Sequence, residues 1–290
     1  MMDLISIENH ENTRFENDNF QFNCFYITNT NTLPHWHNHT EIIYISHGNC
    51  SVYINGTLFS CNEGDVVLTP LGSLHSILPE IDSNYYAIVV GDTLFTSMMT
   101  DFHCKIALQP FLLNRKLTPL HIGNNHPSYS ALVTTIKAII KENGHKNECY
   151  QIIIKAELCR FFARLVRDFP NEIYLRTEQH DINTQTIKKA IAYISTHYSE
   201  KITIADMSKY ANMSKQHFCR LFKAYTGKTF IEFLTIYRLE QSNVILTNTD
   251  LPITQIPDLT GFCNANYYSR IYKNRYGYPP SYTRKKNNHK

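Results

Sequence analysis

The feature that most constrains the fold is a near-repeat in the C-terminal third of the chain. FCRLFKAYTG (218–227) returns fifty residues later as YSRIYKNRYG (268–277). Each copy follows a short helical stretch and a turn, IADMSKYANMS in the first case and ITQIPDLTGFC in the second. The pattern predicts two helix-turn-helix units, at about 203–225 and about 252–275.

Both copies are amphipathic at helical spacing. The apolar side comprises Phe218, Leu221, Phe222 and Tyr225, then Tyr268, Ile271 and Tyr272. The opposite side is rich in Gln, Asn, Arg and Lys, which offer base-edge donors and phosphate contacts together. A single helix of this kind is usually only a solvated surface, but its duplication favours DNA binding. The predicted DNA-contacting residues are Lys215, Gln216, His217, Cys219, Arg220 and Lys223 in the first unit, and Ala265, Asn266, Tyr267, Arg270 and Lys273 in the second.

Charge is distributed unevenly along the chain. Residues 1–183 contain 12 Lys and Arg against 19 Asp and Glu, a net charge of −7. Residues 184–290 contain 16 against 6, a net charge of +10. A basic segment fused to an acidic one indicates a polyanion-binding module joined to something else, although a solvated basic surface is the simpler alternative.

Residues of about 185–284 resemble the AraC/XylS-type DNA-binding domain, in which a long helix, here TFIEFLTIYRLEQSNVILTNT, joins the two units. The matching positions in the second unit are Gly261, Phe262, Tyr268, Arg270, Lys273, Gly277, Pro280 and Arg284. The resemblance implies double-stranded DNA and RNA polymerase as partners, a homodimer, and activation more often than repression.

Three positions depart from the usual family residues. Ser208 and Pro257 replace alanines, and Asn212 replaces a glycine. Asn212 is tolerable because asparagine can adopt the left-handed turn conformation. Proline lacks a backbone donor, so Pro257 is expected to kink or delay the first helix of the second unit. That unit would then sit differently on DNA or bind it less specifically.

The first part of the chain has β-strand signals from about 20 to 92. Short aromatic and β-branched runs alternate with turns, and Asn55-Gly56 predicts a tight hairpin. Strands at this spacing indicate a sandwich or a small barrel. Helical periodicity follows from about residue 127, in PSYSALVTTIKAIIKEN and CYQIIIKAELCRFFARLVRDF.

The segment HWHNHTEIIYISHG (35–48) carries the second candidate site. Strand alternation places His35, His37, His39, Glu41, Ile43 and Ile45 on one face, which the isoleucines indicate is interior. With GDVVLTPLGSLH (64–75), this segment resembles the two motifs of cupin barrels. In metal-binding cupins the positions of His35, His37, Glu41 and His75 are metal ligands. The usual glycine six residues before the first histidine is Asn29, and the usual asparagine four after His75 is Pro79.

Three readings of this cluster remain open. His35, Trp36, His37, Glu41 and His75 could line a pocket for a small organic effector, with an aromatic ring stacking on it. The same histidines and glutamate could instead hold a divalent metal, or they could be purely structural. An organic metabolite, such as a sugar, is favoured, because a regulator needs reversible occupancy. No cofactor is required, and a divalent metal is the alternative.

The combined prediction is a multidomain α+β regulator. It comprises a cupin-like β-barrel (1–125), a helical dimerisation segment (126–170), a linker (171–183) and an all-α domain with two helix-turn-helix units (184–290). Eight scattered cysteines without a CxxC pair, no signal peptide and no membrane-spanning run indicate a reducing cytoplasm. The rival interpretations are a metal-dependent cupin enzyme, such as an oxygenase or isomerase, and a constitutive DNA-binding protein whose barrel only dimerises.

Overall fold

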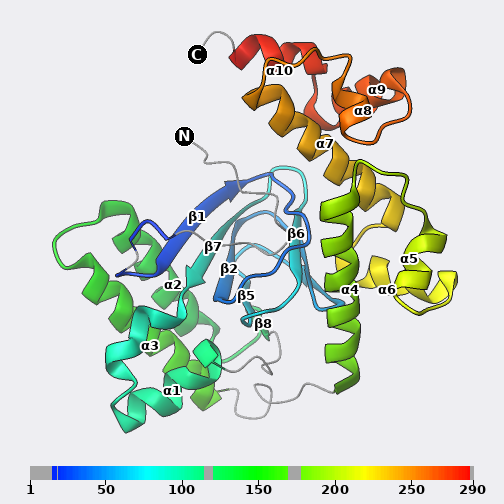
Figure 1. Cartoon of the computed structure of the whole chain (residues 1–290). Coiled ribbons are helices and arrows are strands. Elements are labelled where there is room, and N and C mark those ends of the chain that lie inside the picture. Colours follow the sequence, from blue (N-terminus) through cyan, green and yellow to red (C-terminus); the bar gives the residue numbers. More distant parts are fainter. Residues whose placement is uncertain (1–14, 18, 114–119, 169–177, 288–290) are drawn as a thin grey trace. The chain divides into compact units, whose positions relative to one another are not determined.

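The computed structural model describes residues 15–17, 19–113, 120–168 and 178–287 (Figure 1). The chain divides into two compact units, one spanning His10–Thr184 and the other including Gln185–Lys290. The first is built on antiparallel sheets and the second is helical, which confirms the predicted multidomain α+β class. No helix among the described residues is long and apolar enough to cross a membrane.

Two antiparallel sheets form the N-terminal unit. The five-stranded sheet has the order β1-β7-β2-β5-β8, and the three-stranded sheet has the order β4-β3-β6. Their bounds are β1 (Phe22–Thr28), β2 (Thr40–His47), β3 (Cys50–Ile54), β4 (Thr57–Cys61), β5 (Val66–Thr69), β6 (His75–Pro79), β7 (Asn84–Val90) and β8 (Leu120–Ile122). The predicted Asn55-Gly56 turn joins β3 to β4, and both residues have positive φ, at 48° and 84°.

Alternation along β2 separates the two faces of the larger sheet. Ile43 and Ile45 join a buried cluster with Val52 and Ile77 of the smaller sheet. Residues of the other parity, including Ile42 and Tyr44, belong to a cluster with residues of the helices. Burying one such aliphatic side chain stabilises the fold by about 1.5–3 kcal/mol, so this alternation fixes the strand register.

Three α-helices of the same unit contribute to the cluster on the outer face of the larger sheet. They are α1 (Phe102–Leu113), α2 (Tyr129–His145) and α3 (Tyr150–Asp168), and a 3₁₀ helix, η1 (Asp92–Met98), precedes them. The helices α2 and α3 bury apolar stripes at the spacing that their sequences predict. The segment that folds as η1, α1 and β8 contains none of the elements predicted from the sequence.

The helical unit contains two short helix pairs joined by a long helix. Its elements are α4 (Glu178–His197), α5 (Ile204–Tyr210), α6 (Lys215–Thr226), α7 (Phe230–Asn248), α8 (Ile256–Leu259), α9 (Ala265–Tyr276) and α10 (Pro280–Asn287). Because α4 begins at Glu178, residues 178–183 of the predicted linker are helical, whereas 171–177 lie outside the described residues. Asn212, Gly227, Gly261 and Gly277 lie between successive helices, and all four have positive φ.

Pro257 delays a helix without kinking it. Residues 253–255 form a turn, and α8 starts only at Ile256, so Pro257 occupies its first turn. The amide groups of the first turn have no partner within the helix, so the missing N–H costs little there. The Pro257 carbonyl accepts a hydrogen bond from Phe262 N–H at 2.8 Å. Of the two effects expected of Pro257, a kink or a delay, the structure shows the delay.

Candidate effector site and nucleic-acid interface

The backbone holds His35 and His75 opposite each other. The N–H of His35 donates to the His75 carbonyl at 3.0 Å, and the N–H of His75 donates to the His35 carbonyl at 2.9 Å. Side chains of residues paired in this way project to the same side. The two imidazole centroids are accordingly only 4.2 Å apart.

His37 and Glu41 reach the same place by different routes. His37 lies in an irregular segment before β2, where its carbonyl accepts a hydrogen bond from Gly72 N–H at 2.8 Å. Gly72 has a φ of +69°, which favours glycine at this turn. Glu41 is in β2, with the parity of the inward-facing Ile43. Strand parity therefore accounts for Glu41, but not for His35 and His37, which precede the strand.

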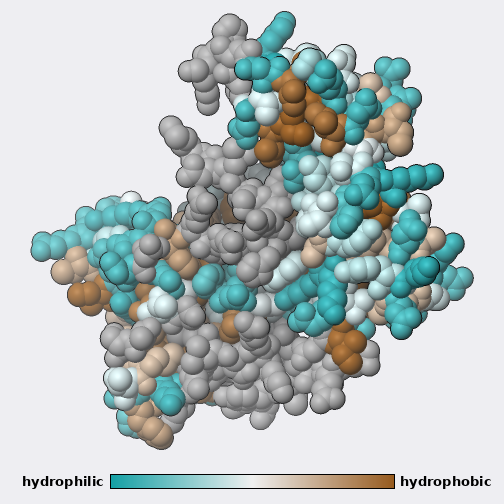
Figure 2. All heavy atoms as spheres, viewed as in Figure 1, coloured by the Kyte–Doolittle hydropathy of each residue, from teal (hydrophilic) through white to brown (hydrophobic). Residues whose placement is uncertain are grey.

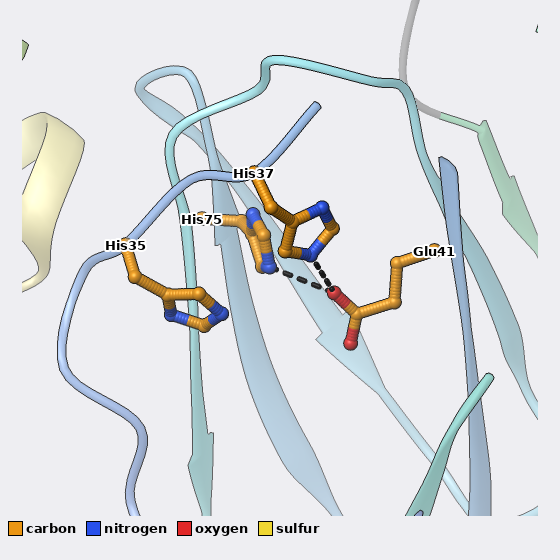
Figure 3. A group of neighbouring side chains, drawn as sticks. All are labelled: His35, His37, Glu41 and His75. Carbon is orange, nitrogen blue, oxygen red and sulfur yellow. Dashed lines mark hydrogen bonds and ion pairs between the residues drawn. The ribbon is translucent and has the colours of Figure 1, made fainter. Parts of the chain in front are cut away.

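The four side chains converge on one point (Figure 3). Glu41 Oε2 lies 3.0 Å from His37 Nε2 and 2.8 Å from His75 Nε2. One ligand atom from each of His35, His37, Glu41 and His75 lies within 4.8 Å of all the others. His37, Glu41 and His75 are buried, and His35 is partly buried.

Each histidine of the cluster directs its Nδ1 atom at a backbone carbonyl. The acceptors are Leu33 for His35 at 2.8 Å, His39 for His37 at 3.1 Å and Ser73 for His75 at 2.9 Å. A carbonyl oxygen can only accept, so Nδ1 carries a proton in all three rings. The Nε2 atoms are thereby left to face the carboxylate, either as lone pairs or with a second proton.

Burial makes a second proton costly. Burial and then the neighbouring His75 charge lower the pKa of His35 to about 3, so this ring is neutral at physiological pH. Burial alone would raise the pKa of Glu41, but the charge of His75 and hydrogen bonds from His37 and His75 hold that pKa well below its usual value. The cluster therefore contains an ionised carboxylate facing imidazole nitrogens, and a metal ion would take the place of any proton on Nε2.

The donor set suits a divalent transition metal. Three imidazole nitrogens and one carboxylate are common zinc and iron-group ligands. Hydrogen bonds from the distal ring nitrogens to carbonyls are the usual means of fixing the tautomer of a metal ligand. His35, His37, Glu41 and His75 would hold the ion, which would supply a positive charge at the centre of the cluster.

Two further residues from the same sequence segment lie outside the cluster. Trp36, predicted to stack on an effector, is partly buried and is not among the four converging side chains. The His39 ring packs edge-on against Phe15, with 5.0 Å between centroids. The carbonyls that orient the histidines were not foreseen, because any residue type can supply a carbonyl.

The first helix-turn-helix unit consists of α5 and α6. Thr203 and Asp206 form a reciprocal capping box at the start of α5, and Ser214 caps α6 by accepting from His217 N–H at 3.2 Å. Asn212 supplies the left-handed turn, with φ of 53°. These local signals explain why the turn ends one helix and starts the next.

The second unit, α8 and α9, repeats this construction. Asn264 caps α9 by accepting from the N–H groups of Asn266 and Tyr267, at 2.9 and 3.0 Å. Arg275 of α9 donates to Glu240 of α7 at 2.7 Å, and Tyr272 donates to Asn243 at 2.7 Å. The long helix α7 thus anchors the second unit through polar contacts as well as through its apolar core.

The predicted inner and outer faces of α6 and α9 agree with the observed burial. Phe218, Leu221, Phe222, Tyr225, Tyr268 and Tyr272 are buried. Nearly all the predicted DNA-contacting residues are exposed, and only His217 and Cys219 are partly buried. Hydrophilic side chains are prominent on the visible surface of the helical unit (Figure 2). The outer faces are therefore available to a ligand.

Two of the exposed arginines are positioned by neighbours on their own helix. Arg220 Nη2 lies 3.1 Å from His217 Nδ1. The Arg270 guanidinium lies over the Tyr267 ring, 5.6 Å from its centroid, as in a cation–π contact. Contacts of this kind restrict the rotamers of the two arginines and so reduce the entropy that they would lose on binding a ligand.

Known proteins share both parts of this chain. A family described as an AraC-like ligand binding domain matches residues 25–99, and a helix-turn-helix domain family matches 207–286. An uncharacterized HTH-type transcriptional regulator of Bacillus subtilis is 25% identical over 81% of this chain and 79% of its own length. A similarly described regulator of Staphylococcus aureus is 22% identical over 81% of this chain, which spans only 30% of that protein.

Two solved structures of bacterial proteins align with this chain. ToxT from Vibrio cholerae aligns with 92% of this chain and 98% of its own, with 15% identity and a TM-score of 0.39. The C-terminal domain of AraT, a response regulator from Geobacillus stearothermophilus, covers 35% of this chain and 84% of its own, with 29% identity and a TM-score of 0.34.

Proposed function

Because the chain is a transcriptional regulator of the AraC family, with a ligand-binding domain followed by a helix-turn-helix DNA-binding domain, we propose that a ligand in the four-residue cluster of the first domain controls DNA reading by α6 and α9. The protein is a regulator rather than an enzyme. Ligand binding would shift the population of DNA-competent states, as in other linked equilibria. Activation through RNA polymerase in the cytoplasm is the mode of action that we infer.

Both helix-turn-helix units are proposed to read DNA. The helix α7 contains 19 residues and is therefore about 28 Å long, close to the roughly 34 Å repeat of B-DNA. A rod of this length suits two recognition helices in successive major grooves on one side of the duplex. The net charge of +10 on residues 184–290 provides the attraction to phosphates.

Selection of bound duplexes from a random pool tests this arrangement. The full-length protein should recover two preferred blocks whose centres are about 10–10.5 base pairs apart. The block contacted by α9 should show the weaker sequence preference, because α8 starts late, at Ile256, with Pro257 in its first turn. Recovery of one block alone would show that only one unit reads bases.

A divalent metal is the ligand that the geometry of the cluster supports best. The supporting observation is that His35, His37 and His75 all donate Nδ1–H to carbonyls and so leave Nε2 for a cation beside Glu41. The sugar favoured by the sequence analysis would need polar groups spread around an open pocket. Here the buried polar groups are turned toward one another.

Elemental analysis of protein purified without a histidine tag tests the metal assignment. His75→Ala should contain one equivalent of metal less than His47→Ala, a matched control because His47 is exposed and lies outside the cluster. Equal metal contents in the two variants would contradict the assignment. If a sugar then raised the melting temperature of metal-free protein but not of His75→Ala, the ligand of the cluster would be an organic effector and not a metal.

Dimerisation is proposed to involve α3. Ile152 and Ile153 are 67% and 41% exposed on this helix, although aliphatic side chains favour burial. Hydrophobic surface is visible near the tip of the α2–α3 hairpin (Figure 2). In sedimentation experiments, Ile152→Asp should yield monomers, whereas Ile81→Asp, a change at an isoleucine in the β6–β7 turn, should leave the dimer intact. Dimers of Ile152→Asp would exclude this face.

A further inference from the structure

A second group of potential metal ligands lies at another place in the N-terminal unit. It comprises Cys61 at the end of β4, Asp65 in the following turn and His121 in β8. One ligand atom from each lies within 4.8 Å of the other two. Asp65 Oδ2 is 2.9 Å from His121 Nε2. Segments far apart in the sequence therefore meet here with a thiol, a carboxylate and an imidazole.

The turn that presents two of these groups is firmly held. Asp65 Oδ2 accepts from Asn62 N–H at 2.9 Å, and the Asp65 carbonyl accepts from Ile45 N–H at 3.0 Å. Gly64 N–H in turn donates to the Ile45 carbonyl at 2.8 Å. His121 comes from the opposite side, on a strand that pairs in register with β5 at Val67. A ligand set preorganised by its backbone loses little entropy on binding an ion.

We propose that Cys61, Asp65 and His121 form a zinc site, distinct from the cluster around Glu41. Sulfur, nitrogen and oxygen ligands together are suited to Zn²⁺, and three protein ligands leave a fourth position open. The cluster around Glu41 has no sulfur, so the two sites differ in softness and should differ in metal preference. Cys61 and Asp65 are buried, whereas His121 is more exposed, which gives the ion a route of entry.

Other roles for Cys61 fit its surroundings less well. The Cys61 thiol is buried beside the Asp65 carboxylate, whereas reactive cysteines lie in partly exposed, electropositive surroundings. A reactive or redox-sensing cysteine requires the opposite environment. The remaining alternative is purely structural: a His121–Asp65 hydrogen bond beside a thiol that packs in the core and donates to the Phe59 carbonyl at 3.7 Å.

An ion at this site would link the sheets to the helical hairpin. It would fasten β8 to the turn after β4, and α2 begins shortly after β8. The same turn already abuts α2, because a Cβ added at Gly64 would collide with the Tyr129 hydroxyl. Occupancy of the site would therefore stabilise the position of the turn, β8 and the start of α2 together.

Titration of the reduced, chelator-treated full-length protein with Co²⁺ tests the proposal. A thiolate bound to Co²⁺ gives an intense near-ultraviolet charge-transfer band, which three histidines and a glutamate cannot produce. We expect this band to saturate and to be displaced by Zn²⁺. It should be lost in Cys61→Ser and strongly weakened in His121→Ala, a change at a more exposed position that should not disturb folding.

Two variants serve as controls. Cys50→Ser alters an equally buried cysteine paired with Cys61 across β3 and β4, and His75→Ala disables only the other cluster. Both should retain the band. The proposal would be overturned if the parent protein lacked the band or if Cys61→Ser retained it. It would also be overturned if Cys50→Ser lost the band while Cys61→Ser did not. These outcomes do not depend on whether the cluster around Glu41 binds a metal.

Discussion

Replacing Gly261 by alanine should destabilise the helical unit much more than the same change at Gly277. The two glycines have nearly the same backbone conformation, with φ of +79° and +81°. A side chain in this left-handed region costs about 1–2 kcal/mol at either position. Because this backbone cost is the same at both positions, a difference in stability between the two variants must come from the atoms that surround each glycine.

The surroundings differ sharply. A Cβ at position 261 would lie 2.6 Å from the Tyr198 carbonyl oxygen and 2.9 Å from Arg238 Nε, whereas at 277 it would meet no described atom within 4 Å. Arg238 donates from Nε to the Tyr198 carbonyl and from Nη2 to the Glu200 carbonyl, both at 2.7 Å. Disrupting a hydrogen bond from a charged donor costs about 1.5–3 kcal/mol. We therefore expect about 3–5 kcal/mol for Gly261→Ala and about 1–2 kcal/mol for Gly277→Ala.

Urea unfolding of the full-length protein measures this difference. With a slope of about 1–3 kcal/mol per molar urea, the extra cost of about 1.5–3 kcal/mol should place the helical transition of Gly261→Ala about 0.5–3 M below that of Gly277→Ala. Far-ultraviolet circular dichroism follows the helices. The single tryptophan, Trp36, lies in the N-terminal unit, so its fluorescence transition should not move and serves as the internal control. Equal shifts for the two variants would refute the steric argument.

Two further predictions concern DNA binding and Pro257. Gln216→Ala and Arg220→Ala should each reduce discrimination between operator and random duplexes by about 1–3 kcal/mol, whereas Lys223→Ala should weaken binding to both equally. Equal losses on both duplexes for Arg220→Ala would identify it as a phosphate contact. Pro257→Ala should lower stability by about 0.4–1 kcal/mol, because the first-turn proline restricts the unfolded chain without straining the helix. A rise in the melting temperature would show that the proline strains α8.

Local patterns were sufficient to predict most of the helical unit. The faces of α6 and α9 follow from periodicity, and the interruptions at Asn212 and Gly261 follow from residue types that tolerate positive φ. The convergence of His35, His37, Glu41 and His75 could also be predicted, although for His35 and His37 the basis is the resemblance to cupin motifs and not strand parity. Their segment is irregular and is positioned by Gly72 and by the backbone of His75.

The pairing of strands that are far apart in the chain could not be predicted from the sequence. His121 meets Cys61 and Asp65 only because β8 returns to the edge of the larger sheet beside β5, and a three-residue strand after a helix has almost no periodic signal. The late start of α8 was anticipated from Pro257, but its consequence for stability was not. Whether a proline is a cost depends on which turn of a helix it occupies, and that depends on where the helix begins.

The helix α7 also restricts the spacing between the two DNA segments that α6 and α9 are proposed to contact. Phe230 and Phe233 of α7 pack against Phe222 of α6, and Glu240 of α7 is tied to α9, so one stiff spacer carries the two helices that are proposed to read DNA. Each base pair inserted between their targets would rotate one target by about 34° around the duplex axis, given about 10.5 base pairs per turn. A spacer that cannot twist would lose one set of contacts after a single insertion. Mutations that change the length of an operator should therefore be more damaging to this regulator than substitutions at any one contacted base.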